Sequence, residues 1–492
     1  MTYKRAFLPI LAYCMAVLGA ADAQGQAQAI PDLAAAPTQA RAADGDYIAW
    51  REHIVDDEAA SGIELRGADG LVMADLDRDG YDDIVSVHES DVEYDGVADG
   101  FIRIAFGTAD PDRWHLVTLA MGPEAGAAED AAIGDLDGDG DLDIVAACEL
   151  AHLIYFENPG ADAQNVRWER LIPSATLGRG SFIRVFIADL NGDGRPEVTT
   201  ANKGAQDPTQ AALEPKAISF FEIDGEPLED GAWREHVLSE VPWPINAEPV
   251  DLDGDGDLDV IGGSVAQGRI VWFENRGSDG TFEFAEHTVE IEGPATDPMP
   301  PVVNGFNMEF VDLNEDGRLD IVTFDTARLI GRSLVWLEQP AAPEGKWRLH
   351  RIGTYAPDQI VGIAVADITG DGLPDVMTGG YSLGSRTSDE ITPTRPLGRL
   401  AWFENLGDAG ERWVRHDFSR RQRGMFDKFV AKDFDGDGDL DFASTRGNSG
   451  PYDGVFWLEQ LREPEPVAAF THARATDSPE VELPAEPVSG SR

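Results

Sequence analysis

Seven short acidic stretches are the part of the sequence best suited to chemistry. The second of them, GDLDGDGDLDIV from Gly134 to Val145, places an aspartate at every second position and then turns abruptly apolar. So many carboxylates in one turn repel each other unless a cation neutralises them. Oxygen ligands that alternate along a tight turn suit a hard cation of flexible coordination, which is Ca²⁺ rather than Zn²⁺ or copper.

The same positions carry oxygen ligands in all seven stretches. Counting the first aspartate as position 1, these are positions 1, 3, 5 and 9, and position 6 is always glycine, as a turn with positive φ requires. The predicted metal ligands are Asp75, Asp77, Asp79 and Asp83; Asp135, Asp137, Asp139 and Asp143; Asp189, Asn191, Asp193 and Glu197; Asp251, Asp253, Asp255 and Asp259; Asp312, Asn314, Asp316 and Asp320; Asp367, Thr369, Asp371 and Asp375; and Asp433, Asp435, Asp437 and Asp441. We expect up to seven structural Ca²⁺ ions, bound more weakly where Asn or Thr stands at position 3.

An EF-hand shares the opening of this motif and is excluded. It requires a bidentate glutamate at position 12 and flanking helices. Position 12 of the seven stretches lies in an apolar strand pattern and is Ser86, Ala146, Thr200, Gly262, Thr323, Thr378 or Ser444.

The elements that position these loops repeat with them. The first aspartates of successive loops are 54 to 66 residues apart, which indicates a repeat fold. Each unit reads as strand A, acidic loop, strand B, an aromatic strand C such as IVWFEN from Ile270, and a strand D with the pattern W-x-x-H, such as WREHVL from Trp233. The histidines of strand D are interpreted as framework.

The order of strands at the two ends of the chain predicts a closed ring. The first strand is a strand D at Trp50, and the last unit ends with a strand C at Val455. We therefore predict an all-β fold, a seven-bladed β-propeller over residues 47–461, in which an N-terminal strand completes the last blade. An open solenoid is the alternative, but it gives no reason for a strand D to come first.

With these loops, the chain resembles the FG-GAP and VCBS repeat proteins, a propeller family that includes the head of integrin α chains. The resemblance implies calcium at the loops and little about activity, because the family is functionally mixed. The chain also resembles the propeller part of aldos-2-ulose dehydratase, which implies a dehydratase or lyase as one option.

The ends of the chain predict export. Residues 1–23 read as a signal peptide with a basic start, an apolar run and an A-x-A cleavage site, residues 24–46 as a flexible linker, and residues 462–492 as a disordered tail rich in Pro and Glu. No other apolar stretch approaches the roughly 20 residues of a membrane span. We expect a secreted or periplasmic protein, and its net charge of −53 excludes nucleic acid as a partner.

Function is expected where the repeats differ, on the face opposite the acidic loops. Candidate ligand-binding residues at the ends of strands A and B are Asp130, Arg184, Lys203, Asn246, Glu248, Asn307, Glu309, Lys428 and Arg446. Candidates for catalysis, as ligands of a second metal or as acid and base, are His88, Glu89, Glu149 and His152. Three interpretations stay open: a solvated channel mouth, a binding site for a carbohydrate or protein, and a carbohydrate-active enzyme. The oligomeric state is left open too.

Overall fold

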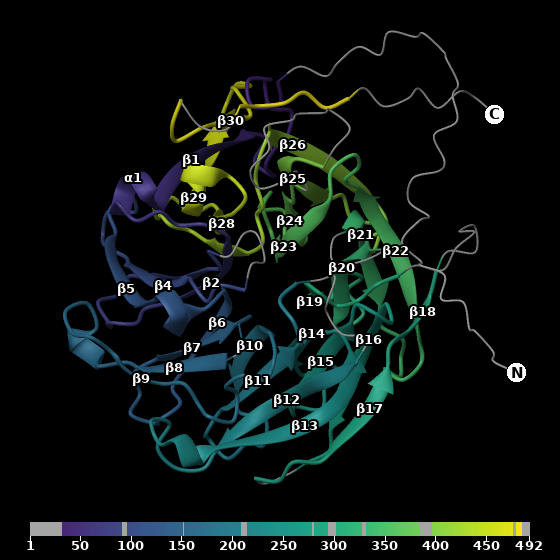
Figure 1. Ribbon diagram of the computed structural model, residues 1–492. Helices are drawn as coiled ribbons and strands as arrows, with labels where there is room; N and C mark the ends of the chain where they lie inside the picture. Colours follow the sequence, from purple (N-terminus) through teal and green to yellow (C-terminus); the bar gives the residue numbers. More distant parts are fainter. Residues whose placement is uncertain are drawn as a thin grey trace, which may run out of the picture.

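The computed structural model describes residues 32–90, 96–150, 152–207, 214–277, 280–293, 302–326, 331–382, 396–475 and 479–484. Within these residues the chain forms seven β-sheet blades arranged around a central axis (Figure 1), which confirms the predicted propeller. The predicted signal peptide lies outside the described residues.

Each blade is built from four antiparallel strands, with strand A nearest the axis (Figure 1). The first three blades consist of β2 (Ala68–Ala74), β3 (Asp83–His88), β4 (Phe101–Phe106) and β5 (His115–Met121); β6 (Ala128–Gly134), β7 (Asp143–Cys148), β8 (His152–Glu157) and β9 (Glu169–Leu171); and β10 (Phe182–Ala188), β11 (Glu197–Asn202), β12 (Pro215–Ile223) and β13 (Trp233–Pro242). The fourth blade consists of β14 (Pro244–Val250), β15 (Asp259–Ser264), β16 (Arg269–Asn275) and β17 (Phe284–Thr288).

A nine-stranded sheet contains the fifth and sixth blades, joined where Gly331 of β21 pairs with Ile360 of β23. Its strands are β18 (Glu290–Glu292), β19 (Glu309–Val311), β20 (Asp320–Thr326), β21 (Gly331–Glu338), β22 (Lys346–Thr354), β23 (Ile360–Ala366), β24 (Asp375–Gly380), β25 (Gly398–Asn405) and β26 (Trp413–Arg421). Helical turns in the described residues are short: α1 (Glu58–Ser61), η2 (Gly122–Ala125), η3 (Gly160–Asp162), η4 (Asp230–Ala232) and η5 (Gly450–Tyr452).

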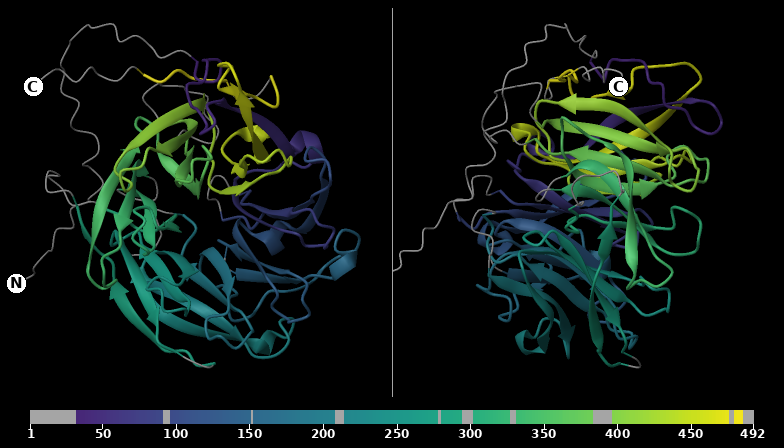
Figure 2. Two further views of the ribbon diagram at one scale, coloured as in Figure 1. Left: turned by 180° about the vertical axis from the view of Figure 1, so that it is seen from behind. Right: turned by 90° about the vertical axis from the view of Figure 1, so that its right-hand side faces the viewer.

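The last blade combines strands from both ends of the chain. Its order is β27 (Phe429–Lys432), β28 (Asp441–Arg446), β29 (Gly454–Glu463), β1 (Tyr47–Asp57) and β30 (Phe470–Thr471). β1 pairs antiparallel with β29 along its whole length and parallel with β30, and Figure 2 shows the purple and yellow strands side by side. Sharing a sheet between the termini gives the last blade its fourth strand.

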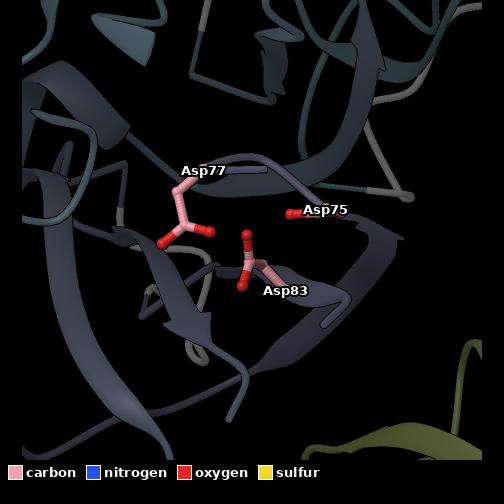
Figure 3. A group of neighbouring side chains, drawn as sticks. All are labelled: Asp75, Asp77 and Asp83. Atoms are coloured by element: carbon pink, nitrogen blue, oxygen red, sulfur yellow. The ribbon is translucent and has the colours of Figure 1, made fainter. Parts of the chain in front are cut away.

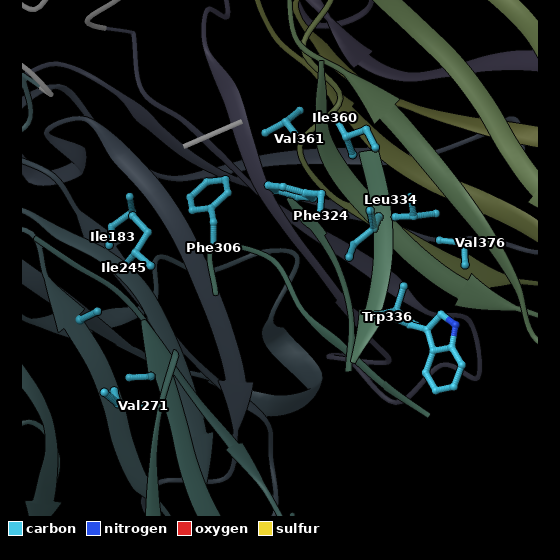
Figure 4. Packing of buried hydrophobic residues seen from close by; sticks show 14 of the residues in the cluster. Ile183, Ile245, Val271, Phe306, Phe324, Leu334, Trp336, Ile360, Val361 and Val376 are labelled. Atoms are coloured by element: carbon cyan, nitrogen blue, oxygen red, sulfur yellow. The ribbon is translucent and has the colours of Figure 1, made fainter. Parts of the chain in front are cut away.

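Packing between blades explains why the strands are apolar on both faces. All six residues of β3 and of β7 are buried, because each blade is covered by a neighbour on either side. One buried cluster extends from Ile183 of β10 and Ile245 of β14 to Trp336 of β21 and Val376 of β24 (Figure 4). These blade-to-blade contacts hold the acidic loops in one ring.

The terminal segments differ from the expected linker and tail. Leu33 and Ala40 of the first segment and Phe470 of the second are buried. Thr38 donates its backbone N–H to the carbonyl of Val467 at 2.8 Å, so the two segments meet. Their composition, rich in Ala and Pro, did not indicate this packing, because small residues become core only where a partner surface exists.

Candidate functional site

The acidic loops are wound tightly around their own carboxylates. In the first loop, the backbone N–H groups of Asp79 and Gly80 donate to the two oxygens of Asp75 at 3.1 and 3.0 Å, and that of Tyr81 donates to Asp79 at 2.9 Å. The glycine at position 6 has φ between 85° and 100° in all seven loops, as the sequence predicts. This turn points several carboxylates toward one centre.

Four loops bring three carboxylates together. In each of them one oxygen per residue lies within 4.8 Å of the others, and Figure 3 shows this arrangement for Asp75, Asp77 and Asp83. The other groups are Asp135, Asp137 and Asp143; Asp251, Asp253 and Asp255; and Asp433, Asp435 and Asp441. Because Ca²⁺–oxygen distances are about 2.3–2.6 Å, oxygens that share one ion lie at most about 5 Å apart, and the donor set fits.

The carboxylate at position 9 connects its loop to strand C. Asp83 accepts the backbone N–H of Leu76 at 2.8 Å and that of Gly107, just after β4, at 2.9 Å. Burial, the largest cause, raises the pKa of Asp83 to about 7, and it raises the pKa of Glu197 and of Asp441 to about 8. A bound divalent cation stabilises the ionised form of such buried carboxyls.

The residue that follows strand C also links neighbouring loops. The side-chain nitrogen of Asn158 donates to the carbonyl of Leu76, in the loop of the preceding blade, and to that of Leu142 in its own, both at 2.9 Å. Asn275 makes the same pair of bonds to Leu190 and Leu258, at 2.6 and 3.0 Å. Asn158 and Asn275 therefore each connect the acidic loops of two adjacent blades.

Three loops are one carboxylate short. Asn191, Asn314 and Thr369 occupy position 3 there, and none of these loops forms a carboxylate triad among the described residues. The sixth loop also has a cation beside it, since Arg462 donates to the carbonyl of Ile368 at 2.9 Å. The geometry fits the expectation of weaker binding at these loops.

On the opposite face, polar side chains from several blades gather at the axis. This axial cluster consists of Asp130, Arg184, Asn246, Glu248, Asn307, Glu309, Asp427 and Lys428, and the sequence analysis missed Asp427. Arg184 of the third blade donates to Asn307, next to the fifth, at 3.1 Å and to Asp427, next to the seventh, at 3.3 Å. Burial raises the pKa of Glu309 to about 7, against the attraction of Lys428.

A second group, the rim cluster, consists of Glu89, Glu129, Glu149, Lys203 and Gln206, all buried. Lys203 forms an ion pair with Glu149, and Gln206 donates to Glu89 at 2.7 Å. Glu129 is 9% exposed, and no hydrogen bond or ion pair from the described residues reaches its carboxyl. Burial first, and then the neighbouring Glu149, raises the pKa of Glu129 well above its usual range.

Glu129 was not predicted from the sequence. Only its position beside Asp130 on strand A could have drawn attention to it, because Glu149 lies on the next strand of the same blade, and Glu89 and Lys203 come from the two neighbouring blades.

Three predicted site residues lie elsewhere. The Nε2 atom of His88 is 3.1 Å from Ser86 Oγ, and that of His152 is 2.9 Å from the carbonyl oxygen of Glu124. Arg446 faces into the last blade, 3.3 Å from Glu52. Among the described residues, the groups of three or more metal-ligating side chains contain loop aspartates and no histidine.

Comparison with known protein families supports the interpretation of the acidic loops as parts of a repeat. A family model described as FG-GAP-like repeat matches residues 75–146, 135–200 and 251–323. The chain is a β-propeller that contains three FG-GAP-like repeats. No curated protein is detectably similar to it in sequence.

Several solved structures are similar to this FG-GAP propeller at low identity. YCF48 from Cyanidioschyzon merolae has a TM-score of 0.46 at 10% identity, over 85% of this chain and 99% of that one. The V. cholerae biofilm matrix protein Bap1 has a TM-score of 0.38 at 13% identity, over 85% and 91%. BBS1N, in a complex with ARL6DN, has a TM-score of 0.42 at 9% identity, over 86% and 98%.

The strand D histidines of the FG-GAP propeller are framework residues. His350 stacks on Trp336 with ring centroids 4.1 Å apart, and its Nε2 lies 2.8 Å from Glu338 on the same strand C. The other four repeat the stacking and the contact to a strand C glutamate: His53, His236, His287 and His416. Within the described residues, no helix has both the length and the apolar character needed to cross a membrane.

Proposed function

We propose that this protein is an exported, calcium-stabilised FG-GAP propeller that binds a carbohydrate at the rim cluster, on the face opposite the acidic loops. The observation that carries the binding proposal is the carboxyl of Glu129, which is 9% exposed, receives no hydrogen bond from the described residues and lies beside Glu149, Lys203 and Glu89. The rim cluster has three carboxyls and only one ammonium group, so it favours a ligand rich in hydrogen-bond donors. The hydroxyls of a sugar provide such donors.

The axial cluster has a structural role, which is to hold the blades together on this face. Arg184 is engaged by Asn307 and Asp427 from distant blades and lies 4.7 Å from the ring of Phe306. A cation that is already paired in this way holds blades together, so we assign ligand recognition to the rim cluster and ring cohesion to Arg184.

The binding proposal is tested by calorimetry with neutral oligosaccharides, because the strongly negative chain repels acidic ones. Cello-, malto- and xylo-oligosaccharides are titrated into the calcium-loaded mature protein. Glu129→Gln should weaken binding about tenfold, and Glu240→Gln, at an exposed position of β13, should leave it unchanged. Lack of binding to all three series, or equal affinity of Glu129→Gln, would count against a carbohydrate site.

The calcium proposal is tested by elemental mass spectrometry of the purified mature chain after dialysis against trace calcium. The four carboxylate triads predict at least four Ca²⁺ ions per chain, rising toward seven at higher calcium. A transition metal in place of calcium would contradict the proposal.

A carbohydrate-active enzyme of the dehydratase or lyase type is the second candidate, favoured by one specific contrast. Glu149 is paired with Lys203, whereas burial raises the pKa of the neighbouring Glu129, and two carboxyls in such different environments can divide the roles of base and acid. Formation of an unsaturated sugar, followed by ultraviolet absorbance and lost in Glu149→Gln, would place this candidate first.

A further inference from the structure

The C-terminal segment adds a short strand to the outer edge of the sixth blade. Glu480 pairs antiparallel with Arg421 at the end of β26, which is the last strand of its sheet. Two backbone hydrogen bonds of 2.7 and 3.0 Å flank this pair, one in each direction. Residues 479–484, which we call the tail strand, therefore occupy a sheet edge in the way that a bound peptide strand does.

The carboxylate of Glu480 is held in a site of its own. One oxygen accepts the hydroxyl of Ser419 at 2.6 Å and lies 3.0 Å from Nε2 of His472. The other oxygen accepts the backbone N–H of Arg420 at 2.7 Å. Burial, the largest influence, acts to raise the pKa of Glu480, but the hydrogen bonds from His472, Ser419 and Arg420 hold it below its usual range. The site therefore favours an ionised carboxylate.

The sixth blade positions its side of this site without help from the tail strand. Nε and Nη2 of Arg420 donate to the two oxygens of Asp358 at 2.7 and 2.9 Å, and both side chains are fully buried. Nη1 of the same arginine donates to the carbonyl of Glu482 in the tail strand at 2.7 Å. Because the ion pair with Asp358 fixes the guanidinium, little reorganisation is needed to receive a peptide.

The tail strand shows which side chains the site selects. The side chain of Glu480 is 10% exposed, and Leu483 is 4% exposed. Pro479 and Glu482 are exposed, and the contact from Arg420 reaches only the backbone of Glu482. The selected pattern is thus an extended peptide of the form Glu-x-x-Leu.

The tail strand is attached far less extensively than a strand of the blade. All eight residues of β25 pair with β26, whereas the tail strand makes two backbone hydrogen bonds to it. A segment with so few contacts opens at a lower free energy than the blade does. We propose that the outer edge of β26 is a binding site for a Glu-x-x-Leu peptide of a partner protein, which displaces the tail strand that occupies the site here.

A fluorescein-labelled peptide of residues 479–484 tests this proposal by titration into the mature chain. The titration uses about 0.15 M salt, which screens repulsion by the acidic protein. The native chain should bind the peptide weakly, because its tethered tail strand competes at an effective concentration on the order of millimolar. Glu480→Lys places a cation beside His472 and releases the tail strand, so this chain should bind the peptide at least about tenfold more tightly.

Glu482→Lys is the matched control. It introduces the same charge change at an exposed position that contributes its backbone carbonyl, so the tail strand stays in place and peptide binding should equal that of the native chain. A peptide carrying Glu480→Gln should bind to the Glu480→Lys chain about tenfold more weakly than the unmodified peptide, because the charged acceptor is lost. Equal binding of the two peptides, or no gain over the native chain, would overturn the proposal.

Hydrogen exchange of the native chain tests the proposal without any variant. The N–H of Val481, which donates to Arg420, should exchange with solvent faster than the N–H groups of β25 that bond to β26. Equally slow exchange would show that the tail strand is a permanent part of the blade, and this result too would overturn the proposal.

Discussion

At the scale of single residues, the repeated strand D tryptophan shows how position in the chain changes the role of a side chain. Trp347 and Trp50 are both about 99% buried, yet only Trp347 has a carbonyl acceptor. The same indole is thus a structural hydrogen-bond donor in one blade and an unsatisfied donor in another. In the other blades the acceptor lies in the turn between strands C and D, whereas among the described residues β1 is the first strand and follows no such turn.

Stability measurements can detect this difference. Trp347→Phe leaves the partly buried carbonyl of Pro343 without its donor, whereas Trp50→Phe removes a donor that has no partner among the described residues. We expect Trp347→Phe to lower the free energy of unfolding by about 1–2 kcal/mol more than Trp50→Phe does. Urea unfolding of both variants, without added ligand, measures it, and equal losses would contradict the account.

The burial of His88 predicts that the free energy of unfolding depends on pH. Burial, followed by repulsion from Arg103, lowers the pKa of His88 to about 3. The unfolded chain takes up a proton near pH 6.5 and the folded chain does not, so the stability that His88 contributes is present above pH 6.5 and is lost as the pH falls toward 3. Between pH 6.5 and pH 5 the native chain should lose on the order of 1–2 kcal/mol more than His88→Gln. Parallel pH profiles of unfolding would contradict this.

At the scale of elements, the residue after strand C joins the acidic loops of adjacent blades in some blades and bonds only within its own blade in others. Asn275 bonds to loops of two blades, through Leu190 and Leu258, whereas Asn405 donates its side chain to Pro374 of its own blade at 3.3 Å. A loop is therefore positioned from outside its own blade as well as from within. This explains why the glutamate-asparagine motif recurs together with the acidic loop.

Asn275→Ala should therefore destabilise the protein more than Asn405→Ala. The first substitution removes one buried and one partly buried hydrogen bond from the side-chain nitrogen, and we expect a loss of about 1–3 kcal/mol. Chemical unfolding of the two variants, both in excess calcium, gives the comparison. If Asn405→Ala lowered the free energy of unfolding as much as Asn275→Ala, the bond from Asn275 to Leu190 of the neighbouring blade would contribute nothing to stability.

At the scale of the whole molecule, stability depends on closing a ring and on neutralising its acidic loops. The net charge of −53 destabilises the compact state by self-repulsion, and the described residues contain a buried free cysteine and no disulfide. Cations at the loops would relieve this repulsion where it is concentrated. The ring then transmits the effect, because loops of adjacent blades share hydrogen bonds.

Chelation should thus lower the melting temperature strongly. Each site held at 100 times its Kd adds about 2.7 kcal/mol, provided that the unfolded chain does not bind calcium. Calorimetry with EDTA and with excess calcium measures the effect, and Asp137→Asn, in one carboxylate triad, should reduce the difference between the two conditions. An unchanged melting temperature in EDTA would contradict a structural role for calcium.

The sequence by itself determined the number of blades, the acidic loops, the positive-φ glycines and the framework histidines. These features are local and repeat at a fixed spacing, so each copy supports the assignment of the others. Tertiary structure alone decided the rest: Glu129 and Asp427 within their clusters, the contacts of His88 and His152, and the packed terminal segments. The contact of Asp427 with Arg184 and that between the two terminal segments join residues far apart in the chain, and strand patterns carry no signal for such neighbours.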